Sequence, residues 1–564
     1  MVDLKANPFY LNDEQIAWVE KTRSAMTDDE KAEQLLCPLM FTDDEEELKS
    51  IISAHNFGAV MFRSGVAEKV QRNLNAMQKV AKIPLLIAAN LENGGDGVAN
   101  EGTSMGNQMM VAATDNEERA YQLGKICGRE GSALGFNWSF APVLDIDMNY
   151  HNPITNVRTY GSDYTRTIRM GRQYIKGLTE EGIAPCIKHF PGDGVDERDQ
   201  HLLTSVNTLS IDEWEATYGQ IYRTMINEGA LTAMIGHIAM PAMEEAVSGQ
   251  PCNEVIPASC SKNILSGYLR GKLGFNGLVS TDASPMVGFL SNSVRREAVP
   301  LCIEYGCDIL LFNKDLEEDL MYMKEGIKNG LLSRERLEDA VTRILATKAA
   351  LNLHTKHADG SICNGPEQMK QIACEEHLAW ARGCADEGIT LVKNVQNILP
   401  LSPAKTKKVL LEILGDFASN ERVQKQVVDI LEKEGFDVTV YVPETFETIF
   451  LNQAVEDFKK KYDLVLYVAN IETASNKTVS RINWHTLFGA GNNLPWFVKE
   501  VPTVFVSFGN PYHLLDAPMI KTFVNSYSNA PHIVDMTFDK LFGKSEFKGK
   551  SPVDAFCGRW DTRL

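Results

Sequence analysis

Short apolar runs alternate with segments of helical period over about the first 355 residues of the chain. Apolar runs of this length are typical of buried strands, and a regular alternation of strands and helices is typical of a parallel sheet. Eight such strands, joined by helices, predict a closed barrel of the TIM type. The eight runs are Gln34–Phe41, Gly58–Phe62, Pro84–Asn90, Trp138–Asp145, Ile183–Phe190, Leu231–Ile238, Gly277–Asp282 and Asp308–Phe312.

A second region with the same rhythm follows a polar stretch. Residues His354–Glu367 contain Gly360 and Gly365-Pro366, which favours a linker, and Glu375–Glu387 has a helical pattern. The predicted fold is therefore α/β: a TIM-like (β/α)8 barrel over residues 1–355, a linker and connecting helix over 356–388, and a smaller α/β sandwich domain over 389–564. Its expected strands are Ile389–Asn394, Lys408–Leu414, Phe436–Val442, Asp463–Ala469, Pro502–Phe508 and Thr522–Asn525.

The charge balance narrows the class of partner. The chain has a formal charge of −19, so no basic excess exists to neutralise nucleic acid or an anionic membrane surface. The N-terminal residues lack the apolar core of a signal peptide, and no apolar run approaches the roughly 18–20 residues of a membrane helix. Eleven cysteines lie scattered without C-x-x-C pairs, a pattern that indicates free thiols. We expect a cytoplasmic protein that binds a small neutral or cationic ligand.

Polar side chains follow several of the expected strands. In a parallel barrel the carboxyl ends of the strands meet at one face, where active sites lie. A lone Asp after a strand is more often a helix N-cap, and His237 inside an apolar run is more often a structural histidine. The residues at these ends are Asn90 with Glu92, Asp145 with Asp147, Lys188 with His189, His237 and Asp282.

The loop after the fifth strand carries an acid/base candidate. Asp199 and His201 occupy alternate positions, which point to the same side of an extended segment, so the carboxylate can hold the imidazole as a general acid/base pair. From spacing alone, a solvated charged loop is the stronger interpretation. Lys188 at a barrel strand end is also a candidate for Schiff-base chemistry. No H-E-x-x-H or similar ligand pair supports a metal site.

Several ordered motifs resemble one family. K-H-F-P-G-D-G followed by D-Q-H is similar to the K-H-F-P-G-H-G … D-S-H signature of the family-three β-N-acetylhexosaminidases. P-L-L-I-A-A-N-L-E-N-G-G, F-A-P-V-L-D-I, N-P-I-T-N-V-R-T-Y-G and G-F-N-G-L-V-S-T-D-A-S resemble further motifs of that family. Near the end, F-G-N-P-Y and F-K-G-K-S-P-V resemble the second domain of its two-domain members.

The resemblance implies a retaining, exo-acting β-N-acetylhexosaminidase that removes terminal β-linked N-acetylglucosamine from small glycans. It assigns the nucleophile to Asp282 and the acid/base to His201, held by Asp199. An imidazole with an ordinary pKa near 6.5 can donate and recover a proton near neutral pH. No cofactor and no metal are implied, and homo-oligomer formation has no supporting pattern. The resemblance assigns sugar binding to Asn90, Arg158, Lys188 and His189.

Three departures from the family pattern concern the choice of sugar. Asn90 stands where the family has Asp, Asp193 stands where it usually has His, and an extra residue precedes the Gly94-Gly95 pair. The alternatives are a β-glucosidase or a phosphorylase of the same fold, a class I aldolase that uses Lys188, and a sugar-binding relative without turnover.

Overall fold

A computed structural model describes residues 2–415, 418–442, 454–487, 490–491 and 493–564. The chain divides into two compact units. The first comprises Met1–Ser104, Ala120–Asn152 and Tyr164–Leu378, and the second comprises Met105–Arg119, Pro153–Asp163 and Ala379–Leu564. The second unit thus includes two short segments from the first third of the chain. The predicted limits at residues 355 and 389 describe a simple division along the sequence and stay a prediction.

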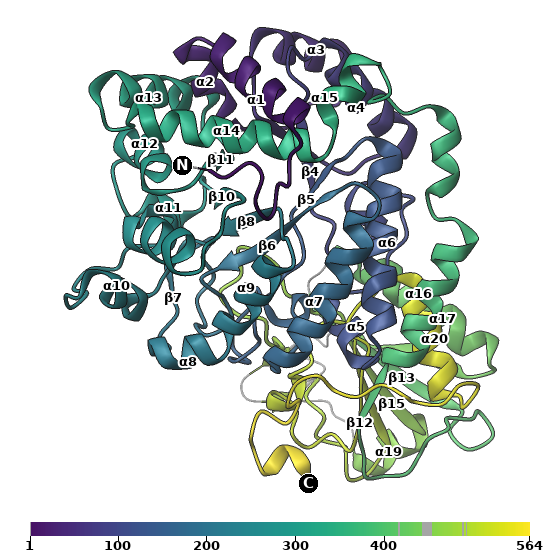
Figure 1. Cartoon of the computed structure of the whole chain (residues 1–564). Helices are drawn as coiled ribbons and strands as arrows, with labels where there is room; N and C mark the ends of the chain where they lie inside the picture. The colour runs from purple at the N-terminus through teal and green to yellow at the C-terminus, as the bar shows by residue number, and fades with distance from the viewer. Residues whose placement is uncertain (1, 416–417, 443–453, 488–489, 492) are drawn as a thin grey trace. The chain divides into compact units, whose positions relative to one another are not determined.

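The first unit is built on a nine-stranded sheet in which every strand pair is parallel. Its strands follow one another in the order β1-β11-β10-β8-β6-β5-β4-β3-β2. Figure 1 labels the strands from β11 to β4 of this order. The strands of the sheet are β1 (Leu36–Cys37), β2 (Leu39–Met40), β3 (Ala59–Phe62), β4 (Leu86–Ala89), β5 (Trp138–Ser139), β6 (Ala184–Phe190), β8 (Thr232–Ile235), β10 (Leu278–Ala283) and β11 (Ile309–Leu311).

The first two strands along the chain, β1 and β2, lie at opposite ends of the strand order. β1 pairs with β11, whereas β2 pairs with β3, and Pro38 lies between them. A proline lacks the N–H that a ladder needs, so it interrupts the strand there. Its carbonyl still accepts a hydrogen bond from Met61 N–H at 2.9 Å. Residues 36–40 therefore act as one broken strand, and the predicted eight-stranded barrel is confirmed.

Helices cover the outside of the barrel strands (Figure 1). Ser333 is the N-cap of α14 and accepts a hydrogen bond from Arg336 N–H. A short strand pair, β7 (Ser205–Val206) with β9 (Ile238–Ala239), follows β6 and β8. The helices are α1 (Asp13–Ala25), α2 (Asp28–Gln34), α3 (Glu45–Ala54), α4 (Ala67–Val80), α6 (Glu117–Leu134), α7 (Tyr164–Thr179), α8 (Ile211–Ala216), α9 (Tyr218–Asn227), α10 (Pro241–Ser248), η4 (Asn263–Lys272), α11 (Val287–Leu290), α12 (Arg295–Tyr305), α13 (Leu316–Asn329), α14 (Arg334–Ala350) and α15 (Leu353–Ala358).

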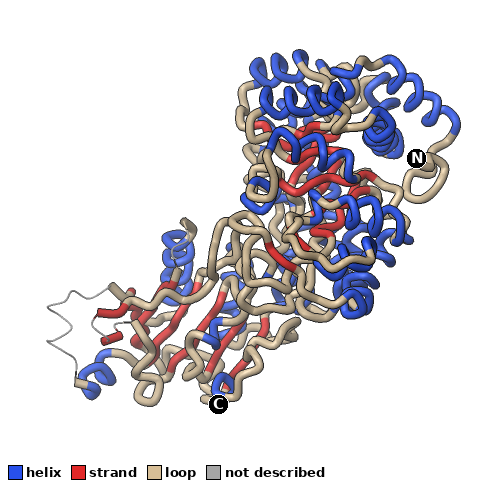
Figure 2. Tube along the Cα trace, turned by 90° about the vertical axis from the view of Figure 1, so that its left-hand side faces the viewer, coloured by secondary structure: helices blue, strands red, loops and turns tan. Residues whose placement is uncertain are grey.

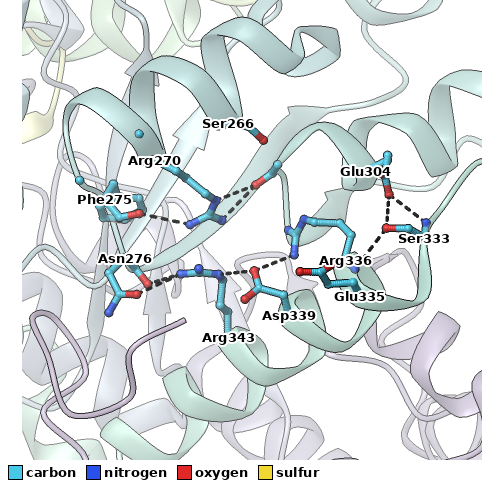
Figure 3. Close-up of a pocket in the computed structure, with 13 residues that line it drawn as sticks. Ser266, Arg270, Phe275, Asn276, Glu304, Ser333, Glu335, Arg336, Asp339 and Arg343 are labelled. Atoms are coloured by element: carbon cyan, nitrogen blue, oxygen red, sulfur yellow. Dashed lines mark hydrogen bonds and ion pairs between the residues drawn. The ribbon is translucent and has the colours of Figure 1, made fainter. Parts of the chain in front are cut away.

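A charged cluster lies at the amino-terminal ends of the last barrel strands. Arg270, Arg336 and Arg343 converge beside Asp339 on the wall of a cavity of about 520 Å³ (Figure 3). Asp308, directly before β11, is fully buried and accepts from Arg270 Nη2 at 2.7 Å and also from Arg336. The active sites of TIM barrels lie at the opposite end, at the carboxyl ends of the strands. We therefore infer that this cluster stabilises the barrel.

The stretch predicted as a linker and connecting helix is partly helical. It contains the end of α15, the 3₁₀ turn η5 (Pro366–Gln371) and α16 (Glu375–Gly388). The helix predicted from Glu375 is confirmed.

The second unit contains a six-stranded sheet in the order β12-β19-β18-β15-β13-β14 (Figure 2, red strands). β12 is antiparallel to β19, and the other pairs are parallel. The expected strands of this region are all present, and helices accompany the sheet. The elements are α5 (Gln108–Ala113), β12 (Thr390–Asn394), β13 (Lys408–Leu414), α17 (Asn420–Lys433), β14 (Asp437–Val440), α19 (Val455–Lys461), β15 (Leu464–Ala469), β16 (Thr486–Leu487), β17 (Ala490–Gly491), β18 (Thr503–Ser507), β19 (Thr522–Asn525) and α20 (Pro531–Leu541).

Candidate active site

The predicted site residues of the first unit lie at the carboxyl ends of the barrel strands. Lys188 and His189 are in the last part of β6, and Asp282 is in the last part of β10. His237 follows β8 by two residues, and Asn90 directly follows β4 and is exposed. The barrel topology therefore brings these side chains to one face, as predicted.

Both strands that carry the main candidates contain an extra residue at the site. Ile187 to Phe190 of β6 spans three steps against two steps of β8, and Ser280 to Ala283 of β10 spans three against two of β11. Such bulges re-aim side chains next to active sites. The irregularities coincide with Lys188 and His189 in β6 and with Asp282 in β10.

Two carboxylates fix the side chains at the end of β6. Asp145 is buried; its Oδ2 accepts from His189 Nδ1 at 2.6 Å, and its Oδ1 accepts from His189 N–H at 3.2 Å. Glu92, in the loop after β4, accepts from Lys188 Nζ at 2.7 Å. Because both side chains are nearly buried, each polar group needs such a partner. The pair therefore forms a rigid, preoriented donor surface.

Asp282 lies near three histidines. Burial raises the pKa of its carboxyl, but the imidazoles of His189, His237 and His201 and the N–H of Ala283 lower it more, so the pKa lies below its ordinary value. The Ala283 N–H donates to Asp282 Oδ1 at 2.7 Å. This carboxylate is consequently ionised at neutral pH, the state that a nucleophile requires. This contact is to the next residue and not to the first turn of a helix, so it does not support the N-cap interpretation.

His237 has a structural place beside this carboxylate. Its Nε2 donates to the Ala283 carbonyl at 3.0 Å, so its Nδ1 accepts from the Ser259 hydroxyl at 2.8 Å. Burial lowers the pKa of His237, although the charge of Asp282 opposes this effect. It anchors the backbone that follows Asp282.

Asp199 and His201 form a hydrogen-bonded pair in the loop between β6 and β7. Asp199 is buried, and its Oδ1 accepts from His201 Nδ1 at 2.6 Å and from His201 N–H at 2.9 Å. Nε2 of His201 is therefore the nitrogen left for proton transfer. The His201 carbonyl accepts from Val287 N–H at 3.1 Å, which ties this loop to α11, directly after β10. The solvated-loop interpretation is therefore wrong for Asp199.

Arg158 is part of a different unit from the other candidates. It is half-buried in the 3₁₀ turn η2 (Asn156–Arg158), which belongs to the second unit. Its sugar-binding role, like those of Asn90, Lys188 and His189, stays a prediction. Across the described ranges, no group of three or more His, Cys, Asp or Glu side chains could hold a metal ion. In the same residues, no helix has the length and apolar character needed to cross a bilayer.

Sequence reasoning missed several supporting residues. Glu92 and Asp145 were among the polar residues predicted at strand ends, but the spacing did not show that they pair with Lys188 and His189. Ser259 and Gln200 had no signal at all, because their contacts depend on loops far apart in the sequence.

Comparison with known proteins identifies the family of the chain. The sequence model described as "Glycosyl hydrolase family 3 N terminal domain" matches residues 27–347. The chain belongs to glycosyl hydrolase family 3. A "Beta-N-acetylglucosaminidase/beta-glucosidase" from Cellulomonas fimi is 43% identical and covers 100% of both chains. A "Beta-hexosaminidase" from Neisseria gonorrhoeae is 31% identical over 49% of this chain and 77% of its own.

Solved structures of the family share the fold. A "Beta-glucoside phosphorylase BglX" superposes with a TM-score of 0.92 at 44% identity, over 99% of each chain. A family 3 β-N-acetylglucosaminidase from Paenibacillus sp. str. FPU-7 superposes with a TM-score of 0.78 at 23% identity, over 94% of this chain and 99% of that one. The second comparison supports the fold alone.

Proposed function

We propose that the protein is a retaining, exo-acting β-N-acetylhexosaminidase that removes terminal β-linked N-acetylglucosamine from small glycans. The observation that carries the proposal is the ionised Asp282 carboxylate under the influence of three histidines, one of which is held by Asp199. The family membership and the names of its relatives support the same class of reaction.

In the proposed mechanism, a carboxylate oxygen of Asp282 attacks the anomeric carbon. The bond from this carbon to the leaving-group oxygen breaks, and His201 Nε2–H gives its proton to that oxygen. A glycosyl ester on Asp282 results. Neutral His201 then takes a proton from water, the water oxygen attacks the anomeric carbon, and the ester bond breaks. Asp199 holds the tautomer of His201 and stabilises the imidazolium, as orienting carboxylates do.

The sugar itself is held, in this proposal, by Asn90, Arg158, Lys188 and His189. Lys188 and His189 offer donors whose orientation is fixed by Glu92 and Asp145. Asn90 both donates and accepts, unlike a carboxylate. N-acetylglucosaminides are the first substrates to test and β-glucosides the second, since the Cellulomonas fimi relative is named for both.

Phosphorolysis is the second candidate, and one feature of the site favours it. A histidine acid/base places no negative charge beside an incoming phosphate, whereas the usual carboxylate would repel it. The β-glucoside phosphorylase structure supports the same alternative. In this case phosphate, rather than water, attacks the ester on Asp282 and yields a sugar 1-phosphate.

The aldolase alternative loses support from the contacts of Lys188. Its Nζ donates to Glu92 in an ion pair, whereas Schiff-base formation requires a neutral amine. Borohydride with a carbonyl substrate should therefore trap no adduct on Lys188. A relative without turnover would show sugar affinity and no product.

The proposed location is the cytoplasm. All eleven cysteines carry free thiols, which supports a reducing compartment. Fractionation of the native cells, with detection of the chain in the soluble or exported fraction, tests this proposal.

A panel of aryl β-glycosides tests the function. N-acetylglucosaminide, N-acetylgalactosaminide, glucoside and xyloside should be compared for wild type, Asp282→Asn and His201→Ala, each with and without phosphate. We expect turnover of the N-acetylglucosaminide, which Asp282→Asn abolishes. Full activity of Asp282→Asn on the preferred substrate would contradict the proposed nucleophile. Sugar 1-phosphate in place of free sugar would establish the second candidate.

A further inference from the structure

Asp193 is a buried carboxylate in the loop after β6. Its carbonyl accepts from the Tyr218 hydroxyl, and its N–H donates to Asp145 Oδ1 at 2.8 Å. Its carboxylate receives three donors: Gly194 N–H at 2.7 Å and Asn152 Nδ2 at 3.2 Å on Oδ1, and Gln200 Nε2 at 3.2 Å on Oδ2. The two oxygens are thus surrounded by N–H groups.

Gln200 connects this carboxylate to the acid/base pair. It lies between Asp199 and His201 in the chain and is buried. Its Oε1 accepts from His237 N–H at 2.7 Å. Only one orientation of the amide places its NH₂ on a carboxylate and its oxygen on an N–H. The Gln200 side chain is therefore fixed at both ends.

The backbone of Gln200 is fixed as well. Its carbonyl accepts a hydrogen bond at 3.2 Å from the N–H of Gly288, the second residue of α11. A Cβ atom on Gly288 would lie 2.7 Å from that carbonyl oxygen and 2.9 Å from His237 Cβ, so only glycine permits this approach. A shift of Gln200 would consequently move His201 relative to Asp282.

We propose that Asp193 is a positioning residue that holds His201 over the site through Gln200, and that it does so in its ionised state. The proposal rests on the proposed function, because it concerns the acid/base of that reaction. A carboxylate accepts stronger hydrogen bonds than a neutral carboxyl, so protonation of Asp193 weakens the hydrogen bond from Gln200. Protonation therefore releases part of the brace.

The electrostatic surroundings place this change near neutral pH. Burial, followed by the charges of Asp145 and Asp199, raises the pKa of Asp193 to about 7, although the hydrogen bonds from Gly194 and Asn152 lower it. The brace is complete above this pH and weakens as the pH falls through it. The titratable groups around Asp193 are Asp145 and Asp147 from the loop after β5, His189 from β6, Asp199 from its own loop, and Tyr218 and Tyr222 from α9.

The test compares two substrates that differ in their need for acid. A β-linked disaccharide has a poor leaving group that His201 must protonate, whereas a dinitrophenyl β-glycoside leaves without help. Asp193→Asn keeps the size of the side chain but puts an NH₂ among the three donors. We expect a loss of at least tenfold in kcat for the disaccharide and a change of less than threefold for dinitrophenol release.

The pH profile gives a second readout. For wild type, kcat on the disaccharide should fall below pH 7 as Asp193 gains its proton. In Asp193→Asn this acid limb should move to lower pH, because asparagine does not titrate. Glu244→Gln neutralises a buried carboxylate that binds Ser261 and Asn263 and not this loop, so it should retain the wild-type profile.

A third variant keeps the test valid if Asp193→Asn folds poorly. Gln200→Leu removes the link and should reproduce the substrate-selective loss, and the double variant should be no worse than Gln200→Leu alone. Equal losses on both substrates, additive losses in the double variant, or an unmoved acid limb would overturn the brace. Wild type that releases no dinitrophenol would instead overturn the proposed function.

Discussion

Removing the charge of Asp308 should cost the barrel much of its stability without touching the site. This carboxylate is fully buried, and its Oδ2 accepts from Arg270 Nη2 and from Val279 N–H, each at 2.7 Å. Its Oδ1 accepts from Arg336, and Arg343 Nε lies 3.9 Å away. Asp308→Asn turns one accepting oxygen into an NH₂ that faces a guanidinium.

The magnitude follows from the buried cations. Breaking a buried ion pair by removing one partner costs about 3–5 kcal/mol, because the other charge stays buried. Burial already lowers the pKa of Arg270 to about 10, against the opposite effect of Asp308, which shows how much the cluster depends on this carboxylate. For a unit of roughly 350 residues, with an unfolding entropy of about 2 cal/mol/K per residue, the loss corresponds to a decrease in Tm of about 4–7 °C.

Urea unfolding followed by tryptophan fluorescence, together with a thermal scan, measures the effect. Glu335→Gln is the matched control, because Glu335 lines the same cavity but is exposed. It should change the free energy of unfolding by less than about 0.5 kcal/mol. Asp308→Asn should keep wild-type kcat at 25 °C. Equal stability of Asp308→Asn and Glu335→Gln would refute the reasoning.

Three further predictions concern single side chains. Asp199→Asn should reduce turnover of a disaccharide about 10- to 100-fold, since a hydrogen bond to a charged group contributes about 1.5–3 kcal/mol. Turnover of aryl glycosides with good leaving groups should fall much less. Equal losses on both substrates would contradict the role of His201. Glu92→Gln should raise KM about tenfold with a smaller effect on kcat, because Lys188 loses its ion-pair partner. An unchanged KM in steady-state kinetics would exclude a sugar contact by Lys188. Burial raises the pKa of Glu412 to about 9 from 4.5, so the second unit loses stability as the pH rises from 4.5 to about 9. In urea unfolding at pH 8, Glu412→Gln should therefore stabilise this unit by about 1–3 kcal/mol. A variant less stable than wild type would contradict this prediction.

The strands could be predicted because buried parallel strands appear as short apolar runs. The run Gln34–Phe41 shows the limit of that signal: the sequence indicates one strand, whereas Pro38 divides it into β1 and β2 on opposite edges of the sheet. The segments 105–119 and 153–163 belong to the second unit, and no local pattern indicates this. Their assignment depends on contacts between residues hundreds of positions apart.

Some features of the candidate site could likewise be predicted from the sequence, whereas others could not. Strand-end positions placed Lys188, His189, His237 and Asp282 at one face, because the barrel forces the carboxyl ends together. The bulges in β6 and β10 could not be predicted, since they depend on the register of neighbouring strands. Gln200 could not be predicted either, because its role depends on a hydrogen bond to the His237 backbone.

Trapping of the glycosyl-enzyme intermediate tests the central claim most directly. A 5-fluoro N-acetylglucosaminyl fluoride and a 2-deoxy-2-fluoro glucosyl fluoride react quickly but leave an ester that hydrolyses slowly. Intact mass spectrometry followed by peptide mapping should find one sugar per chain on Asp282 of wild type and none on Asp282→Asn. A label on any other carboxylate, such as Glu92 or Asp145, would contradict the assignment, as would turnover by wild type with no covalent adduct.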